Sequence, residues 1–328
     1  MSNVADWARG AVRWETGLAI VVLLILIVGS AVSPDFLTGN NLFNLGLSNG
    51  EIAIMTLPMT LIIISGEIDL SVASILGLAS ALLGVLWSKG WPMPAVFVVV
   101  ALTGLAAGAV NGLLVTRLRL PSLAVTIGTL ALYRGIATIL LGPNTVSSFP
   151  TAYTNLGINA VPFTGNDITY STAIFLVLAL IFGVVLHATP AGRSIYAMGA
   201  SAEAAQFAGI RVKRVKTILF MVSGLICALA GVLYTFRLDT AVQNNGLGLE
   251  LSVVAIVLLA GHFILKIPFD DLVGVASGAT GNPAILVYST RMAPTERPDI
   301  GYAMIFPSMT IVKVIAVQVV GLLSGVGG

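Results

Sequence analysis

Long apolar stretches alternate with short polar ones along most of the chain. A helix needs about 20 mostly apolar residues to cross the hydrocarbon core of a bilayer. Nine stretches approach that length and are predicted as membrane-spanning helices. They cover residues 17–32, 52–64, 71–87, 93–115, 122–141, 171–187, 217–236, 249–267 and 301–322. The first is interpreted as an uncleaved helix rather than a signal peptide, because further spans follow it.

The second stretch differs from the others in two ways. It is too short to span a membrane unless residues 45–50 extend it past Glu51. Pro58 also interrupts it, and a broken helix is tolerated in a membrane only where protein or water satisfies the freed backbone groups. We therefore expect this segment to lie inside the bundle rather than against lipid.

Composition supports the same fold class. Of the 328 residues, 57% are hydrophobic and 9% are charged, and the mean hydropathy is +1.01. Soluble domains carry roughly 25% charged residues, so a soluble enzyme and a nucleic-acid-binding protein are excluded. The prediction is an all-α, polytopic integral membrane protein with about 8–10 transmembrane helices. Cys227 is the only cysteine and the two histidines lie far apart, so neither a disulfide nor a metal site is expected.

The basic residues predict an orientation. Cytoplasmic loops carry an excess of Lys and Arg. With a cytoplasmic N-terminus, nine basic residues face the cytoplasm, whereas the opposite loops up to residue 250 hold only Lys89 and Arg237. The nine are Arg9, Arg13, Arg117, Arg119, Arg193, Arg211, Lys213, Arg214 and Lys216.

The basic loop 190–216 contains a predicted short helix. Ser201 is a good N-cap, Glu203 favours the first turn, and Gly209 can end the helix in the left-handed conformation. Ala204 and Ala205 are strong helix formers between them. Two interpretations remain: a connector resting on headgroups, with residues 211–216 attracted to anionic lipid, or a docking element for a cytoplasmic partner.

Polar residues inside or beside the spans are candidates for a transport pathway. Glu67 and Asp69 either line its inner mouth or form a turn in which Asp69 and Ser71 cap the next helix. Arg134 either snorkels to the outer interface or lines a polar cavity. Asn111 is a further candidate, although the glycine-rich segment 104–112 around it suits close helix packing. The segment 142–170 either covers the pathway or is a plain connector.

Several motifs carry a family resemblance. They are ISGEIDLS at 64–71, NGLLVTRLRLPSLAVTIGT at 111–129, YRG at 133–135, the Glu203-Ala204-Ala205 sequence with Gly209 inside 192–209, and LSVVAIVLL at 251–259. Residues 14–260 thereby resemble the permease subunits of bacterial ATP-binding-cassette importers for ribose, xylose, rhamnose and autoinducer 2. In that family the Glu-Ala-Ala loop docks onto a separate ATPase.

The resemblance implies a set of partners. They are a cytoplasmic ATP-binding subunit, a second permease subunit, a periplasmic or lipid-anchored sugar-binding protein, the sugar and membrane lipid, in a bacterial inner membrane. No cofactor is implied. A P-loop needs Gly-Lys followed by Ser or Thr, and none of the five lysines follows a glycine. The chain is therefore predicted to be a transport subunit rather than an enzyme.

Residues 261–328 depart from this pattern. The sequences GVASGATGNP at 274–283 and DIGYAMIFP at 299–307 resemble the C-terminal end of the aspartate–alanine exchanger family. The glycines and proline there suit a re-entrant or broken helix, followed by one more span. The tail leaves two alternatives open: a secondary transporter driven by an ion gradient, or a non-functional fusion.

Overall fold

The computed structural model describes residue 23 and residues 26–162 and 168–265. The chain divides into two compact units, Met1–Val254 and Ala255–Gly328. Besides the helical residues 26–32, the described residues form ten helices: α3 (Gly39–Ile64), α4 (Val72–Ser88), α5 (Met93–Arg117), α6 (Ser122–Leu141), α7 (Thr151–Ile158), α8 (Tyr170–Ala188), α9 (Pro190–Ala200), α10 (Ala202–Phe207), α11 (Val212–Leu238) and α12 (Leu249–Leu265). Two short strands, β1 (Val146–Ser147) and β2 (Thr240–Ala241), pair antiparallel.

The fold class predicted from the sequence is confirmed. Within the described residues, α3, α5, α6, α8 and α11 are each long and apolar enough to cross a membrane, and α4 is a shorter apolar helix of 17 residues. The described part of the first predicted span, residues 26–32, is helical. The span at 301–322 lies outside the described residues, so the total of 8–10 spans stays a prediction.

Helix α3 differs in part from what Pro58 led us to expect. The helix extends N-terminally through Glu51 to Gly39, so it includes residues 45–50, which the sequence needed for a full membrane span. It continues through Pro58 without a break. Pro58 is buried inside the unit. Its position inside the bundle is therefore confirmed, whereas the predicted interruption is wrong.

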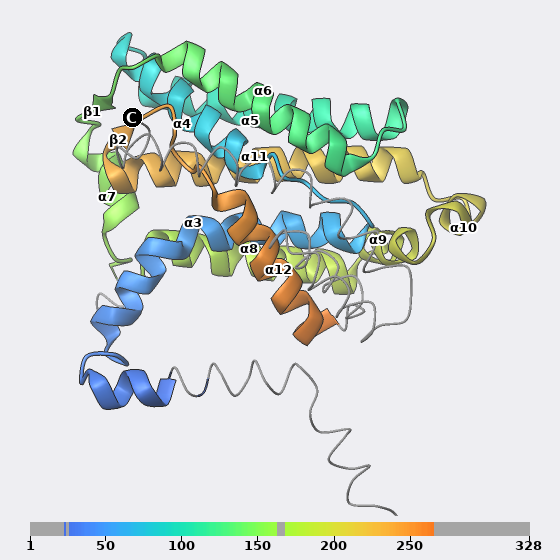
Figure 1. Ribbon diagram of the computed structural model, residues 1–328, viewed down its shortest axis with the longest axis horizontal. Coiled ribbons are helices and arrows are strands. Elements are labelled where there is room, and N and C mark those ends of the chain that lie inside the picture. The colour runs from blue at the N-terminus through green and yellow to red at the C-terminus, as the bar shows by residue number, and fades with distance from the viewer. Residues whose placement is uncertain (1–22, 24–25, 163–167, 266–328) are drawn as a thin grey trace, which may run out of the picture. The chain divides into compact units, whose positions relative to one another are not determined.

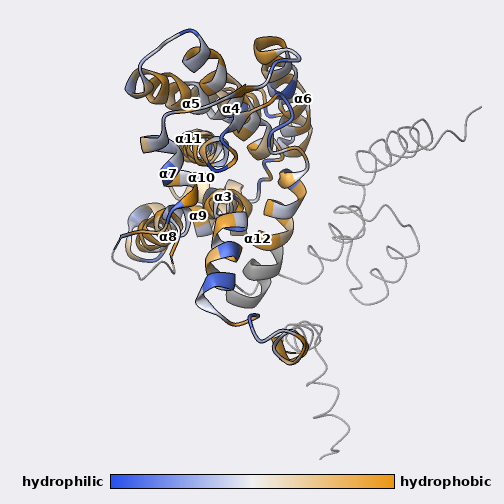
Figure 2. Ribbon diagram, turned by 90° about the vertical axis from the view of Figure 1, so that its left-hand side faces the viewer, coloured by the Kyte–Doolittle hydropathy of each residue, from blue (hydrophilic) through white to orange (hydrophobic). Residues whose placement is uncertain are grey.

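The first unit is a bundle built around α11. This helix contacts α5, α4, α3 and α7, while α6 packs on α4 and α8 packs on α3. Figure 1 shows these long helices running side by side, and Figure 2 shows them nearly end-on with apolar residues over much of their surface. Helix α8 buries little of its apolar surface in the unit, as expected for a helix that faces lipid.

Glycines allow α5 and α11 to approach closely. Gly104, Gly108 and Gly112 recur every four residues on α5, so they lie along one face. A Cβ atom on Gly108 would collide with the backbone oxygen of Phe220, and one on Gly104 would come within 2.5 Å of the backbone oxygen of Gly224. Helix association in lipid depends on such close packing of small residues, and the packing role predicted for segment 104–112 is confirmed.

The two ends of this bundle differ in charge. At one end, here called the basic end, α3 and α5 finish and α11 begins, with α9 and α10 beside them (Figure 1). Seven of its residues are basic: Arg117, Arg119, Arg193, Arg211, Lys213, Arg214 and Lys216.

The opposite end, here called the strand end, carries β1, β2 and α7. The backbone N–H of Phe149 donates to Asp239 at 3.0 Å. Tyr153 stacks on Phe236, which also makes an edge contact with Phe97. The segment 142–170 thus contains ordered elements, and these aromatic rings fasten its described part to α5 and α11.

Candidate functional site

The short helix predicted in the basic loop is present as α10. Ser201 is its N-cap, and the Ser201 hydroxyl accepts a hydrogen bond from the Ala204 N–H at 3.1 Å. Glu203 lies in the first turn, where a negative charge complements the helix dipole. The predicted start of the helix is therefore confirmed.

The end of α10 is also the predicted one. Gly209 has φ of +88°, a conformation in which a side chain would be strained. The Gly209 N–H donates to Gln206 O and the Ile210 N–H donates to Ala205 O, both at 3.0 Å. These two bonds form a Schellman motif, which satisfies carbonyls that the helix itself leaves unpaired.

One side of α10 faces the protein and the other faces outward. Ala205 is 3% exposed, whereas Glu203, Ala204 and Gln206 are exposed. Phe207 is 86% exposed. Exposed aromatic side chains are enriched among the residues that contribute most to protein–protein interfaces.

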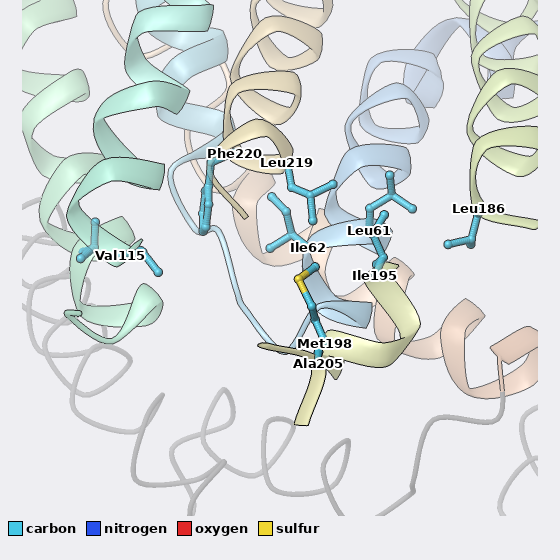
Figure 3. Packing of buried hydrophobic residues seen from close by; sticks show 10 residues of the cluster. Leu61, Ile62, Val115, Leu186, Ile195, Met198, Ala205, Leu219 and Phe220 are labelled. Atoms are coloured by element: carbon cyan, nitrogen blue, oxygen red, sulfur yellow. The ribbon is translucent and has the colours of Figure 1, made fainter. Parts of the chain in front are cut away.

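A hydrophobic cluster at the basic end holds α9 and α10 in place. It joins residues from α3, α5, α6, α8, α9, α10 and α11, so the short helices need not be stable alone (Figure 3). The cluster contains Leu61, Ile62, Val115, Val125, Leu186, Ile195, Met198, Ala205, Leu219 and Phe220. Gly199 of α9 lies directly against the backbone oxygen of Ile64, where a Cβ atom would collide.

The connector at residues 65–71, between α3 and α4, lies beside this cluster and is bonded to α6 and α11. The Ile68 N–H donates to Ser122 Oγ on α6 at 3.2 Å. Glu67 forms an ion pair with Lys216 of α11, and both side chains are largely buried. Since Lys216 lies in the second turn of α11, the connector is linked to the helix that directly follows the loop containing α10.

We expect the Glu67–Lys216 pair to stabilise the basic end. Lys216→Glu places two carboxylates together and should lower the melting temperature of the purified protein. The double variant Glu67→Lys/Lys216→Glu restores the attraction and should recover most of the loss. The measurement is thermal unfolding in detergent. If the double variant melts no higher than the single one, the attraction between residues 67 and 216 does not contribute to the stability of the protein.

Asp69 lies at the centre of a buried polar network. It is 0% exposed. Its Oδ1 accepts from the Ser71 hydroxyl at 2.6 Å and the Ser71 N–H at 3.0 Å, and its Oδ2 accepts from Ser223 of α11 at 3.2 Å. A buried carboxylate is costly unless hydrogen bonds compensate it, and these three donors do so.

Asn111 extends the network to α5 and α6. Its side-chain N–H donates to the Ser71 hydroxyl at 2.7 Å, and its Oδ1 accepts from Tyr133 at 3.3 Å. Ser71 is the N-cap residue of α4, but its side chain makes no capping bond. The expected capping by Ser71 is therefore wrong, because its hydroxyl is used between Asp69 and Asn111.

Arg134 lies on α6 and belongs to a separate site. It donates from Nη1 to Asn245 O at 2.7 Å and from Nη2 to Ala73 O at 3.3 Å. Its Nε is buried and has no hydrogen-bond partner among the described residues. The guanidinium therefore points into the protein rather than snorkelling to the interface.

The four predicted pathway residues thus fall into three places. Asp69 and Asn111 are joined through Ser71, Glu67 lies at the basic end, and Arg134 lies elsewhere. Sequence reasoning missed Ser223 and Tyr133, for which a polar side chain inside a span was the available signal.

A second buried ion pair was also missed. Glu51 of α3 accepts from Arg237 Nε of α11 at 3.0 Å, near the strand end. Glu51 is 1% exposed, and Arg237 also lies 5.0 Å from the ring centre of Tyr234. A glutamate inside an apolar span was the available signal. In the part of the chain that the structure describes, no group of His, Cys, Asp and Glu is arranged to hold a metal ion.

Comparison with known proteins gives the family. Residues 41–293, more than half of the chain, match the protein family described as the permease component of the branched-chain amino acid transport system. The chain belongs to this permease family. The match ends inside the predicted C-terminal segment 261–328, whose separate origin stays a prediction; the structure describes that segment only to residue 265.

Individual relatives agree with the family. The autoinducer 2 import system permease protein LsrD of Escherichia coli K12 is 32% identical over 257 residues, which is 76% of each chain. The permease LsrC of Shigella flexneri is 31% identical over 259 residues, covering 77% of this chain and 72% of the relative. No solved structure matches. The resemblance to sugar-importer permeases is therefore confirmed, and the family is one of membrane transport subunits rather than enzymes.

Proposed function

We propose that the chain is the membrane subunit of an ATP-driven importer for a sugar-related substrate, and that α9 and α10 form its coupling loop. The observation that carries the proposal is the form of α10. It is capped at both ends, fixed to the bundle through Ala205, and projects Phe207 into solvent. This arrangement suits a rigid element that fills a groove on a separate ATPase.

The proposed partners follow from the same arrangement and from the relatives. The chain lacks a P-loop lysine, so a cytoplasmic ATPase must supply the energy. LsrD and LsrC are two different permease proteins of autoinducer 2 import systems, and the chain is similar to both. We therefore propose that it pairs with a second permease subunit, identical or related, and receives substrate from a sugar-binding protein.

For the substrate pathway, we propose different roles for the predicted residues. Asp69 and Asn111 have all their side-chain polar atoms hydrogen-bonded within the protein, which suits fixing the connector. Glu67 is likewise engaged by Lys216. Arg134 retains an unused donor, Nε, and is the candidate for a substrate contact.

The orientation is proposed from the charge at the two ends, with the basic end in the cytoplasm of a bacterial inner membrane. We predict that a cysteine at position 213 is protected in intact cells, whereas one at position 89 is labelled by an impermeant thiol reagent. Both changes, Lys213→Cys and Lys89→Cys, are made in a Cys227→Ala background, since Cys227 is the only native cysteine. Labelling of position 213 in intact cells would show that the basic end faces outward and would contradict the proposed orientation.

The function is tested by transport in proteoliposomes. The chain is reconstituted with an ATPase, a second permease subunit and a sugar-binding protein of an importer of this family, and uptake of autoinducer 2 and of pentoses and hexoses is followed. We expect uptake that requires both ATP and the binding protein. Uptake by this chain alone, driven by an ion gradient without ATP, would contradict the proposal and favour the exchanger alternative.

A further inference from the structure

A groove at the basic end lies between the last turns of α5 and the first turns of α11. Its volume is about 540 Å³. Eight residues line it: Leu113, Thr116, Arg117, Lys213, Arg214, Thr217, Ile218 and Met221. The proposed function assigns no role to this groove.

The residues that line the groove change in character with depth. Arg117 ends α5, and Lys213 and Arg214 begin α11, so three cations stand at its mouth. Next come Thr116 and Thr217, whose hydroxyl oxygens lie 3.0 Å apart. Leu113, Ile218 and Met221 follow, and Met221 is about 12 Å from Lys213 by helical rise. This order of charged, hydroxyl and apolar groups matches the headgroup, glycerol region and acyl chain of a phospholipid.

The cations at the mouth have no acidic partner within the part of the chain that the structure describes. Among the residues that the structure describes, the ion pairs are Lys216–Glu67 and Arg237–Glu51, and neither involves Arg117, Lys213 or Arg214. Two of these cations also lie at the N-terminal end of α11, where positive charge opposes the helix dipole. A bound anion would relieve both the mutual repulsion and the unfavourable interaction with the dipole.

The apolar wall of the groove is likewise uncovered. Leu113 is 42% exposed and Ile218 is 47% exposed, on helices long and apolar enough to span the bilayer. In a membrane such side chains face lipid tails. The groove therefore combines an anion-binding mouth with a surface for an acyl chain, and basic pockets between transmembrane helices bind anionic lipid headgroups.

We propose that this groove binds one anionic phospholipid, with its phosphate at Arg117, Lys213 and Arg214 and an acyl chain along Leu113, Ile218 and Met221. The lipid bridges α5 and α11 close to the loop that leads from α10. This assignment requires only that the chain lies in a membrane, so it does not depend on the ATPase or the substrate.

Native mass spectrometry of the detergent-purified protein tests the proposal. The probes are phosphatidylglycerol and phosphatidylcholine with identical acyl chains. The groove variant is Arg117→Gln/Lys213→Gln/Arg214→Gln. Its matched control is Arg119→Gln/Arg193→Gln/Arg211→Gln, which removes the same charge from exposed residues of the same end outside the groove. We expect one tightly retained phosphatidylglycerol on the native protein and the control, and about tenfold weaker retention by the groove variant.

A second variant removes the apolar part of the site and leaves the charges. Ile218→Trp fills the groove beside the acyl chain and should also weaken retention of phosphatidylglycerol. It tests the proposal even if the triple groove variant fails to fold. Equal losses in the two triple variants, or equal retention of the two lipids by the native protein, would overturn the proposal. So would a groove variant that keeps its lipid but loses the co-expressed ATPase, because the cations would then serve a protein interface.

Discussion

Replacing Gly108 by alanine is expected to destabilise the protein strongly, by about 1–3 kcal/mol or more. The added methyl group would collide with the Phe220 backbone oxygen and would lie 2.8 Å from the Met221 Cα atom. Backbone atoms of a packed helix cannot rotate away as a side chain does, so α5 and α11 must move apart. In lipid no hydrophobic force offsets that loss of contact, because the solvent is as apolar as the helices.

Gly128 provides a matched control for this substitution. It also lies inside an apolar helix, α6, but a Cβ atom there would meet nothing within 4 Å. Gly128→Ala should therefore leave stability unchanged or raise it slightly through helix propensity. The measurement is the melting temperature of each variant in detergent. Equal melting of the two variants would mean that close approach of α5 and α11 does not limit stability.

The second large effect is expected at Phe207. Phe207→Asp should abolish ATP-driven import and weaken binding of the ATPase by about 2 kcal/mol or more, the usual loss at an aromatic hot spot. Phe207 is 86% exposed in the isolated chain. Surface substitutions of this kind change stability by less than about 0.5 kcal/mol, so the variant should insert and melt like the native protein.

Leu247 provides a matched control for Phe207. Leu247 is 66% exposed and is held in the segment between β2 and α12. Leu247→Asp introduces the same charge on another exposed apolar side chain, and it should leave ATPase binding unchanged. If Phe207→Asp still supports import at the native rate, Phe207 is not an anchor for the ATPase.

The features that the sequence predicted correctly are local ones. Ser201 and Gly209 determine the start and the end of α10 through hydrogen bonds that span at most five residues. Apolar length likewise predicted the long helices, because a span is a property of one continuous segment. Pro58 was misjudged because the surrounding bundle can hold a proline within a continuous helix.

Contacts between distant segments could not be predicted in this way. Asp69 meets Ser223 only because α11 passes beside the connector, and 154 residues separate the two in sequence. The partners Glu51 and Arg237 are 186 residues apart. A charge inside an apolar span signals that a partner is needed, but hydrophobic periodicity does not say which helix supplies it.

The exposure of Phe207 was also beyond the sequence. In a helix of only six residues, the way the helix is rotated about its axis when it docks decides which side chains are buried and which are exposed. The burial of Ala205 in the hydrophobic cluster at the basic end fixes the rotation of α10 about its axis. Phe207, two residues further along, is then directed away from the bundle.

Site-specific photo-cross-linking to the co-expressed ATPase tests the central claim most directly. A photoreactive phenylalanine analogue at position 207 preserves the aromatic ring, and the same analogue at position 247, in the exposed segment between β2 and α12, serves as the control. The account predicts a covalent adduct between permease and ATPase from position 207 and none from position 247. Import-competent complexes that give no adduct from position 207, or equal adducts from both positions, would contradict the assignment of α10 as the coupling helix.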